Sequence, residues 1–203
     1  MDLFSSEEVQ NEQHVDLPDA NIVYFPKFLS TEETAYYFST LKKETPWQHD
    51  DIKVFGKIYK QPRLTALYGD EGKHYSYSNI TMHPTAFTTA LLKIKNKIES
   101  VSAAYFNVVL LNLYRDGSDS NGWHSDDEKE LGKNPIIASL SLGAKRVFQL
   151  RNKENKKVRH NLELTNGSLL LMRGSTQHFW QHQIPKTKKV IDPRINLTFR
   201  YIP

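Results

Sequence analysis

The chain has 203 residues and a mass of 23.6 kDa, with no cysteine and a formal net charge of +4. This length fits one domain with a single core, and the lack of cysteine excludes disulfides and thiolate metal ligands. Neither a membrane-length apolar run nor a signal peptide is recognisable, because the polar segment 1–20 lacks their basic and apolar regions. We therefore expect a soluble, monomeric, cytoplasmic protein (nuclear in a eukaryotic host) with no membrane partner.

Charge is distributed unevenly along the chain. Residues 1–20 contain six acidic residues and no lysine or arginine, whereas residues 21–203 carry 27 basic and 17 acidic residues, a net charge of +10. The first twenty residues have few large apolar groups, so we expect a disordered acidic tail before a single domain at 21–203. Basic clusters at 145–146, 151–159 and 186–189 either attract a polyanion such as nucleic acid or are solvated hairpin tips.

Two helices are predicted in the first half of the domain. The sequence Ser30-Thr31-Glu32-Glu33 has the form of a capping box, opening a helix that we expect to continue to about Lys43. A second helix is expected from Pro84, because apolar residues recur there at three- and four-residue intervals. These residues are Phe87, Leu91, Ile94 and Ile98. Both helices are expected to support the fold rather than form the site.

From residue 105 onward the sequence predicts short strands separated by turn residues. The expected strands are 106–114, 136–142, 146–150, 158–164, 168–172, 176–182 and 195–201. Helices followed by a run of strands indicate an α+β chain. We expect residues 105–203 to close into a jelly-roll catalytic core, with the two N-terminal helices of 21–104 buttressing one outer face.

Three residues of this strand-rich half are of types that commonly bind metal ions. His124 and Asp126 are two positions apart, so in an extended segment both side chains point to the same side. His182 lies 56 residues after Asp126, far enough to return on another strand and face the same cavity. Two imidazoles and a carboxylate are the ligand set of a mononuclear non-haem iron(II) site with open coordination positions. A His-X-Asp pair alone is weak evidence for a metal site. Such pairs often occur by chance, and most exposed His and Asp side chains are simply solvated.

The C-terminal segment strengthens this interpretation. Arg194 and Arg200 are six residues apart on a predicted strand, so both guanidinium groups lie on one face, with Asn196 and Thr198 between them. The other face carries Ile195, Leu197, Phe199 and Tyr201. A guanidinium holds a carboxylate through two parallel hydrogen bonds and stays charged when buried. We expect a small dicarboxylate to bind here; the alternative is an edge strand with solvated arginines.

Taken together, these motifs resemble the AlkB family of iron(II)/2-oxoglutarate dioxygenases, which repair alkylated nucleic acids. The resemblance spans about residues 55–201, and the order and spacing of its blocks agree. The blocks are Pro62-Arg63, Tyr68-Gly69-Asp70, Asn112-Leu113-Tyr114, His124-Ser125-Asp126-Asp127-Glu128, His182 and Arg194-Ile195-Asn196-Leu197-Thr198-Phe199-Arg200. The resemblance implies a double-stranded β-helix core, the use of Fe(II), 2-oxoglutarate and O2, and nucleotide-recognition hairpins within 21–104.

The resemblance also implies the roles of the site residues. The catalytic iron ligands would be His124, Asp126 and His182. The residues binding 2-oxoglutarate would be Arg194 and Arg200 through its carboxylates, with Asn112, Tyr114, Asn196 and Thr198 completing its hydrogen bonds. His178 is the rival third ligand, but its interval to Arg194 does not match the family, so we assign it to packing or to support of the ligands.

Substrate contacts are expected from Phe55, Arg63, Tyr68, Asp127 and Glu128. A base methylated on its pairing edge must be flipped out of a duplex, and Tyr68 would stack on the flipped ring. Asp127 and Glu128 would read its cationic edge, or they form an ordinary acidic turn. Phe55 would be the wedge that fills the gap, or it is a core anchor. Arg63 would contact the lesion strand or a surface carboxylate.

The expected function is oxidative demethylation of 1-methyladenine and 3-methylcytosine in single- or double-stranded DNA. In this direct-reversal repair, 2-oxoglutarate becomes succinate and CO2 while the methyl group leaves as formaldehyde. The alternatives are a related oxygenase acting on RNA or another substrate, and a non-catalytic nucleic-acid-binding jelly roll. Intact ligands and both arginines argue against the binder, which would gain nothing from a buried diacid pocket.

Overall fold

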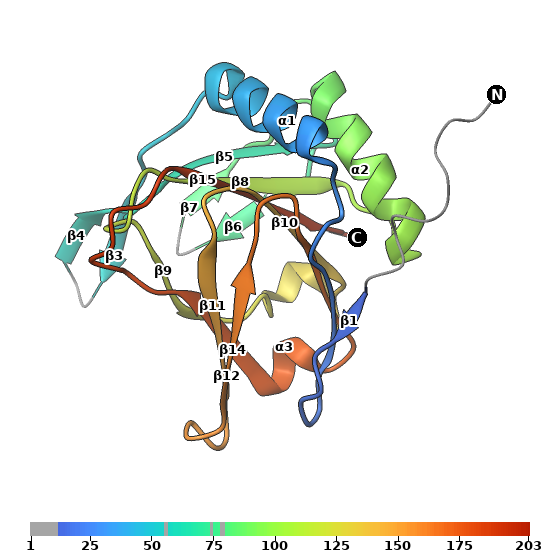
Figure 1. Ribbon diagram of the computed structural model, residues 1–203, viewed down its shortest axis with the longest axis vertical. Coiled ribbons are helices and arrows are strands. Elements are labelled where there is room, and N and C mark those ends of the chain that lie inside the picture. The colour runs from blue at the N-terminus through green and yellow to red at the C-terminus, as the bar shows by residue number, and fades with distance from the viewer. Residues whose placement is uncertain (1–11, 55–56, 74, 78–79) are drawn as a thin grey trace.

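The computed structural model describes residues 12–54, 57–73, 75–77 and 80–203. Two antiparallel sheets enclose a common interior, and two helices cover the outer side of the larger sheet (Figure 1). In spatial order the larger sheet contains β1 (Gln13–His14), β2 (Asn21–Phe25), β13 (Leu169–Arg173), β10 (Ile137–Gly143), β15 (Arg194–Arg200), β8 (Val108–Tyr114) and β5 (Leu64–Gly69). The smaller sheet contains β12 (Arg159–Leu164), β11 (Arg146–Asn152), β14 (Trp180–Ile184) and β9 (Asn121–His124). The expected jelly-roll core is confirmed.

Two further hairpins and two short helical turns complete the described structure. One hairpin pairs β3 (Asp51–Val54) with β4 (Lys57–Lys60), and the other pairs β6 (Tyr75–Tyr77) with β7 (Ile80–Met82). The turns are η1 (Lys129–Leu131) and α3 (Thr176–Phe179). Among the described residues, no helix combines the length and apolar character needed to cross a bilayer.

The first helix begins where the capping box predicts. In α1 (Thr31–Glu44), Oγ of Ser30 accepts a hydrogen bond from the backbone N–H of Glu33, and the Glu33 carboxylate accepts one from the Ser30 N–H at 2.8 Å. The second helix, α2 (Thr89–Ser102), begins five residues later than expected. The segment before it pairs with β5 instead, through backbone hydrogen bonds of Thr85 with Leu67 and Gly69. Phe87 therefore packs on the core from outside the helix.

The core has two parts, one on each side of the larger sheet. Side chains of α1 and α2 pack against the outer face, whereas the inner face packs against the smaller sheet. Strand β15 contributes Ile195, Leu197 and Phe199 to the helix-facing part, as expected from their alternation. Tyr201 was expected to continue this apolar row, but it lies beyond the strand end and is 47% exposed. There it contacts the ring of Tyr105 edge-on at 5.9 Å.

Two further expectations about elements were wrong. Ordered structure begins within the segment 1–20, because β1 pairs with β2 and the Pro18 carbonyl accepts a hydrogen bond from Nε1 of Trp180 at 2.8 Å. Residues 1–11 lie outside the described range. The expected strand 176–182 is instead the single turn α3 followed by β14, since Thr176 and His178 donate hydrogen bonds back to the Arg173 and Ser175 carbonyls.

Candidate metal and cosubstrate site

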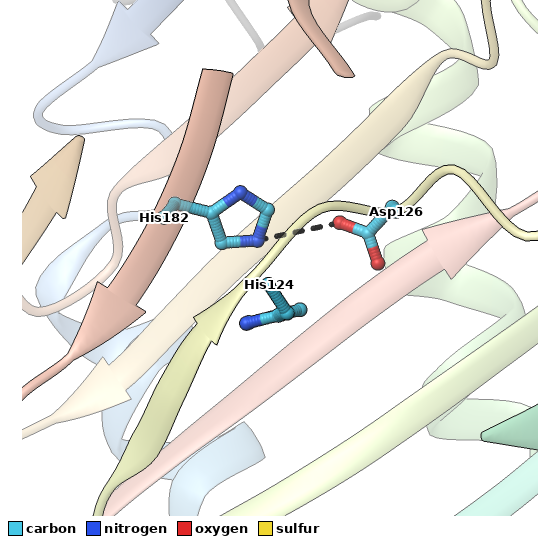
Figure 2. Close-up of side chains that lie close together, drawn as sticks. All are labelled: His124, Asp126 and His182. Atoms are coloured by element: carbon cyan, nitrogen blue, oxygen red, sulfur yellow. Dashed lines mark ion pairs between the residues drawn. The ribbon is translucent and has the colours of Figure 1, made fainter. Parts of the chain in front are cut away.

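The three predicted metal ligands meet inside the barrel. Neighbouring strands β9 and β14 place His124 directly opposite His182, and their ring centroids are 4.2 Å apart. Asp126 follows two residues after the end of β9. One ligand atom from each of the three residues lies within 4.8 Å of the others, so the side chains converge on one point (Figure 2). Among the described residues, this is the one group of three or more such side chains that can hold an ion.

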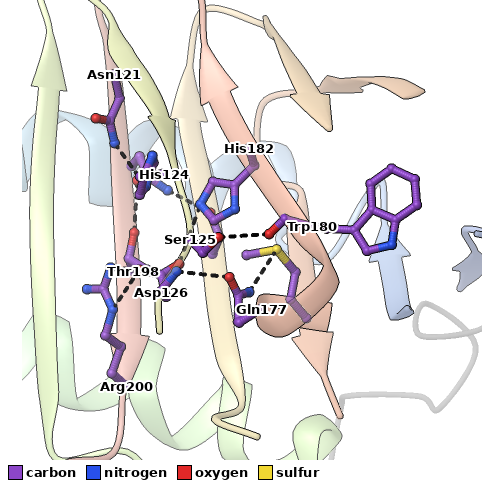
Figure 3. Close-up of polar contacts among 12 residues, drawn as sticks. Asn121, His124, Ser125, Asp126, Gln177, Trp180, His182, Thr198 and Arg200 are labelled. Carbon is purple, nitrogen blue, oxygen red and sulfur yellow. Dashed lines mark hydrogen bonds and ion pairs between the residues drawn. The ribbon is translucent and has the colours of Figure 1, made fainter. Parts of the chain in front are cut away.

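Hydrogen bonds to the β13–β14 connection hold the chain after β9 in place. Gln177, a buried residue of α3, accepts a hydrogen bond from the backbone N–H of Asp126 at 2.9 Å (Figure 3). Oγ of Ser125 donates to the Trp180 carbonyl at 2.9 Å. Asp126 is therefore held by hydrogen bonds to the segment that carries His182. Strand alternation predicted only that its side chain points to the same side as that of His124.

The hydrogen bonds of His124 determine which of its ring nitrogens can bind a metal. Its Nδ1 lies 2.8 Å from the carbonyl oxygen of Gly122, which can only accept, so the proton resides on Nδ1. Nε2 then carries the lone pair that can bind a metal, and Nδ2 of Asn121 lies 3.3 Å from it. This arrangement orients a metal-binding imidazole in the way that partners of ligand histidines usually do.

Burial and charge put all three side chains in the protonation states that a metal requires. Burial and the adjacent His124 lower the pKa of His182 to about 3, outweighing the opposite effect of Asp126. Burial also lowers the pKa of His124. For Asp126, burial raises the pKa, but the positive charge of Arg200 brings it well below its usual range. The set is thus two neutral imidazoles and one carboxylate, which fits iron(II).

A partly open cavity extends from these ligands along the inner face of β15. Arg194, which is 1% exposed, donates from Nη2 to Oγ of Ser141 at 2.9 Å. Its Nε and Nη1 have no hydrogen-bond partner among the described residues. A buried guanidinium with unused donors fits a carboxylate, so this end of the cavity suits one end of 2-oxoglutarate.

The other predicted cosubstrate residues form a polar row beside Arg194. Asn196 donates to Oγ of Ser139 at 2.8 Å, while its Oδ1 accepts from Thr198 at 3.0 Å and from Asn112 at 3.3 Å. Tyr114 is buried, and its ring lies 5.2 Å from the Arg194 guanidinium. Arg200 is placed differently: its guanidinium donates to Oδ1 of Asp126, so it supports the metal ligand directly.

Arg63 belongs to the same cavity. It is 3% exposed, and its Nε donates to Oδ1 of Asn112 at 2.6 Å, while Nη1 lies 3.3 Å from the Ser120 carbonyl. The surface-carboxylate alternative for this arginine is therefore wrong. Its contacts are with the cosubstrate row rather than with an exposed strand-binding surface.

The predicted substrate contacts are only partly brought together. Tyr68 is 3% exposed and packs in the helix-facing core, because the alternation of β5 points it away from the cavity; its expected stacking role is wrong. Asp127 is exposed, and its carboxylate pairs with Lys153 at 2.7 Å. Glu128 is half-buried and precedes η1. Phe55 lies outside the described residues, so its two interpretations stay open.

Other residues of the site were not predicted. Phe148 stacks on His182 with ring centroids 5.0 Å apart, and Gln177 holds Asp126. Ser139 and Ser141 bond the Asn196 and Arg194 side chains, and their alternation within an apolar strand was a signal that could have identified them. The rival ligand His178 lies on the exposed side of α3 and contacts Asn134 at 2.8 Å, away from the cluster.

A jelly roll with a His-X-Asp…His set facing its interior is the architecture of a mononuclear non-haem iron oxygenase. Comparison with known families supports this class: the model of the 2OG-Fe(II) oxygenase superfamily matches residues 21–200. The solved structure "The structure of OsALKBH1" has the same fold, with a TM-score of 0.65 and 17% identity over 94% of this chain and 99% of that chain.

Curated relatives narrow the class. "Alpha-ketoglutarate-dependent dioxygenase alkB homolog 3" from Bos taurus is 44% identical over 191 residues, covering 87% of this chain and 64% of the relative. "DNA oxidative demethylase ALKBH2" from Mus musculus is 39% identical over 178 residues, covering 84% of this chain and 71% of the relative. The chain belongs to the AlkB family of the 2OG-Fe(II) oxygenase superfamily. It spans 64 to 66% of the length of the alkB homolog 3 relatives that it matches.

Proposed function

We propose that this protein is an iron(II)- and 2-oxoglutarate-dependent dioxygenase that removes methyl groups from the bases of nucleic acid, with DNA as the main substrate. The observation that carries the proposal is the convergence of His124, Asp126 and His182 on one point of a cavity that also holds the unpaired donors of Arg194. A binding protein without turnover has no use for a metal triad combined with a buried cation.

The side chains divide the work between metal and cosubstrate. Nε and Nη2 of Arg200 both donate to Oδ1 of Asp126, which leaves Oδ2, 3.4 Å from Nε2 of His182, to bind the metal. Arg194 would hold the distal carboxylate of 2-oxoglutarate through its unused guanidinium donors. When bound, iron(II) and 2-oxoglutarate would supply the chemistry that uses O2: one oxygen atom of O2 would enter a methyl C–H bond as a hydroxyl group, and the other would enter succinate as 2-oxoglutarate loses CO2. A methyl group on a base nitrogen is then released as formaldehyde, which restores the base.

Charge and relatives support nucleic acid as the substrate. Residues 21–203 carry a net charge of +10, which favours association with a polyanion. The relative from Mus musculus is named a DNA oxidative demethylase. We propose the cationic bases 1-methyladenine and 3-methylcytosine as substrates, because Asp127 and the half-buried Glu128 follow the metal ligand Asp126 directly. The hairpins β3–β4 and β6–β7, both within 21–104, are the proposed recognition elements.

The decisive experiment measures formaldehyde release from methylated single- and double-stranded DNA and RNA. Iron(II) and 2-oxoglutarate are each omitted in turn. We expect release from DNA that requires both additions, with succinate formed in equal amount. Release from RNA alone would transfer the proposal to the RNA alternative, and binding of DNA without any release would establish the non-catalytic jelly roll instead.

Phe55 provides a second test of the substrate. If it fills the gap left by a flipped base, Phe55→Ala lowers repair of duplex DNA by roughly tenfold while single-strand repair changes little, since only a duplex needs the gap filled. The ratio of the two initial rates is the measurement. Equal losses on both substrates would favour the core-anchor interpretation.

A further inference from the structure

Arg146, the first residue of β11, is a buried cation that none of the roles above uses. It is 4% exposed and lies where the inner face of the smaller sheet meets the loops that follow β8 and β14. Nη2 donates to the carbonyls of Asp119 at 2.9 Å and Pro185 at 2.7 Å, and Nη1 lies 3.3 Å from that of Asp116. These carbonyl acceptors carry no formal charge; the Asp119 and Asp116 carboxylates attract the guanidinium without a direct salt bridge to it.

The same guanidinium reaches the cosubstrate residues through Tyr114. Cζ of Arg146 lies 5.5 Å from the centre of the Tyr114 ring, and Cζ of Arg194 lies 5.2 Å from it. Two buried cations therefore share one aromatic ring, an arrangement held by attraction of each cation to the ring despite their mutual repulsion. In the part of the chain that the structure describes, no carboxylate forms a salt bridge with either arginine.

Burial and the neighbouring cation both act on the protonation of Arg194. Burial, and to a lesser extent the charge of Arg146, lower the pKa of Arg194 to about 10, although Tyr114 opposes them. Arg194 is still charged at neutral pH. Two like charges in a poorly solvated region favour an anion between or beside them more strongly than one charge would. Arg194 has the unused donors to receive that anion, whereas the donors of Arg146 are engaged.

The loop that Arg146 holds is closely packed, which makes it a rigid support. Between Asp116 and Asp119 lies Gly117, where an added Cβ would come within 2.5 Å of the Thr187 carbonyl oxygen. The Gly117 carbonyl in turn accepts a hydrogen bond from the Thr187 N–H at 2.8 Å. Arg146 thus joins the loop after Tyr114 to the segment that leads into β15 and Arg194.

We propose that Arg146 is a positioning and selectivity residue of the cosubstrate pocket. It fixes the ring of Tyr114 and supplies a second positive charge that favours a 2-oxo diacid over a 2-oxo monoacid, without touching the cosubstrate. The inference rests on the proposed function, because it takes 2-oxoglutarate as the ligand of Arg194. A merely structural Arg146 would support the loop but make no distinction between ligands that differ only in their distal carboxylate.

Calorimetry on the full chain loaded with manganese(II) measures how the charge of Arg146 affects the dissociation constants of two ligands. The ligands are 2-oxoglutarate and 2-oxobutyrate, which share the keto-acid end but differ in the distal carboxylate. In Arg146→Gln we expect roughly tenfold weaker binding of 2-oxoglutarate, because its distal carboxylate loses the attraction of one positive charge in a poorly solvated region, with 2-oxobutyrate changed by less than about twofold. Equal changes for both ligands, or none for either, would overturn the proposal.

Two variants complete the design. Arg146→Lys keeps the charge and should bind 2-oxoglutarate within about threefold of the wild-type protein; a tenfold loss in the folded lysine variant overturns the charge role even if the glutamine variant fails to fold. Arg115→Gln is the matched control, since Arg115 supports the same loop through the Asp119 carboxylate at 2.8 Å but is largely exposed. It should leave both affinities unchanged.

Steady-state kinetics provides the second readout. Arg146→Gln should raise KM for 2-oxoglutarate by the same factor as the dissociation constant and leave kcat at saturation within about twofold, because the metal ligands are untouched. A fall in kcat with unchanged KM would contradict the assignment. If the wild-type protein itself does not bind 2-oxoglutarate, the proposed function fails; if it binds and the variants match it, only the inference about Arg146 fails.

Discussion

The two faces of strand β15 in the larger sheet are almost equally buried, yet they differ in chemistry. On β15, Ile195, Leu197 and Phe199 face the helices and are fully buried in an apolar core. The alternate residues from Arg194 to Arg200 face the barrel interior and are almost as inaccessible, but they are polar and retain unused donors at Arg194. Burial alone therefore does not separate stability from function. Unsatisfied polar groups do, because a fold without a ligand has no reason to keep them.

The largest effect is expected at the metal end of the polar face. His124→Ala removes a proposed metal ligand, so turnover should fall by at least about 1,000-fold, because metal-assisted catalysis lowers the barrier by several kcal/mol. The His124 side chain is only half-buried, so its loss should matter little for folding. The free energy of unfolding of the metal-free protein should change by less than about 1 kcal/mol. Formaldehyde release and urea unfolding of the metal-free variant measure the two quantities. Turnover above a few per cent of wild type would remove His124 from the metal site.

The apolar face should give the opposite result. Phe199→Ala opens a hole in the helix-facing core beside Phe106, whose ring centroid lies 6.1 Å away, and should lower the free energy of unfolding by about 3–5 kcal/mol. Turnover per folded molecule should stay within about twofold. Tyr201→Ala is the matched control on the same chain segment, since its exposed ring should contribute about 0.5 kcal/mol or less. If Phe199→Ala leaves stability intact but abolishes turnover, the division between the faces is wrong.

The sequence predicted those parts of the site that follow from regular alternation. On β15 a period of two separates four polar residues from three apolar ones, and the same period brings His124 and Asp126 to one side. Tyr68 shows the limit of this reasoning. The segment 64–69 is apolar at both parities, so alternation places Leu67 and Tyr68 on opposite faces without indicating which face meets the cavity. That choice depends on where the helices pack.

Contacts between distant segments were not predictable for another reason. Gln177 bonds the backbone of Asp126 across 51 residues, and Phe148 stacks on His182 from a neighbouring strand. Neither residue type nor local spacing indicates such a pairing. The turn at α3 was not predicted either, because the residue types in this segment favour a strand as readily as a turn. The hydrogen bonds that form the turn run from Thr176 and His178 to nearby backbone carbonyls.

At the cosubstrate end of the polar face the expected effect is intermediate. Arg194→Lys keeps a positive charge but loses the two-donor fork, so KM for 2-oxoglutarate should rise by roughly 10- to 100-fold, with kcat at saturation little changed. Titration of the initial rate with 2-oxoglutarate measures both. Arg151→Lys is the control, since Arg151 bonds Gln181 outside the cavity. An unchanged KM in Arg194→Lys would place the diacid elsewhere.

The smallest effect tests the boundary between the faces at Tyr68. Its side chain packs in the helix-facing core, where burial raises the pKa of the phenol and the Thr45 side chain interacts with its hydroxyl. Tyr68→Phe should therefore lower the free energy of unfolding by about 1 kcal/mol, the net contribution of one hydrogen bond, and change repair of methylated DNA by less than about twofold.

A base-stacking residue would also tolerate this change, so Tyr68→Leu is needed as well. Leucine keeps apolar volume in the core but removes the aromatic face, so turnover per folded molecule stays near wild type if Tyr68 belongs to the core. A tenfold or larger loss in the folded leucine variant, with KM for DNA raised, would return Tyr68 to the substrate and show that the sheet does not separate the two functions at β5.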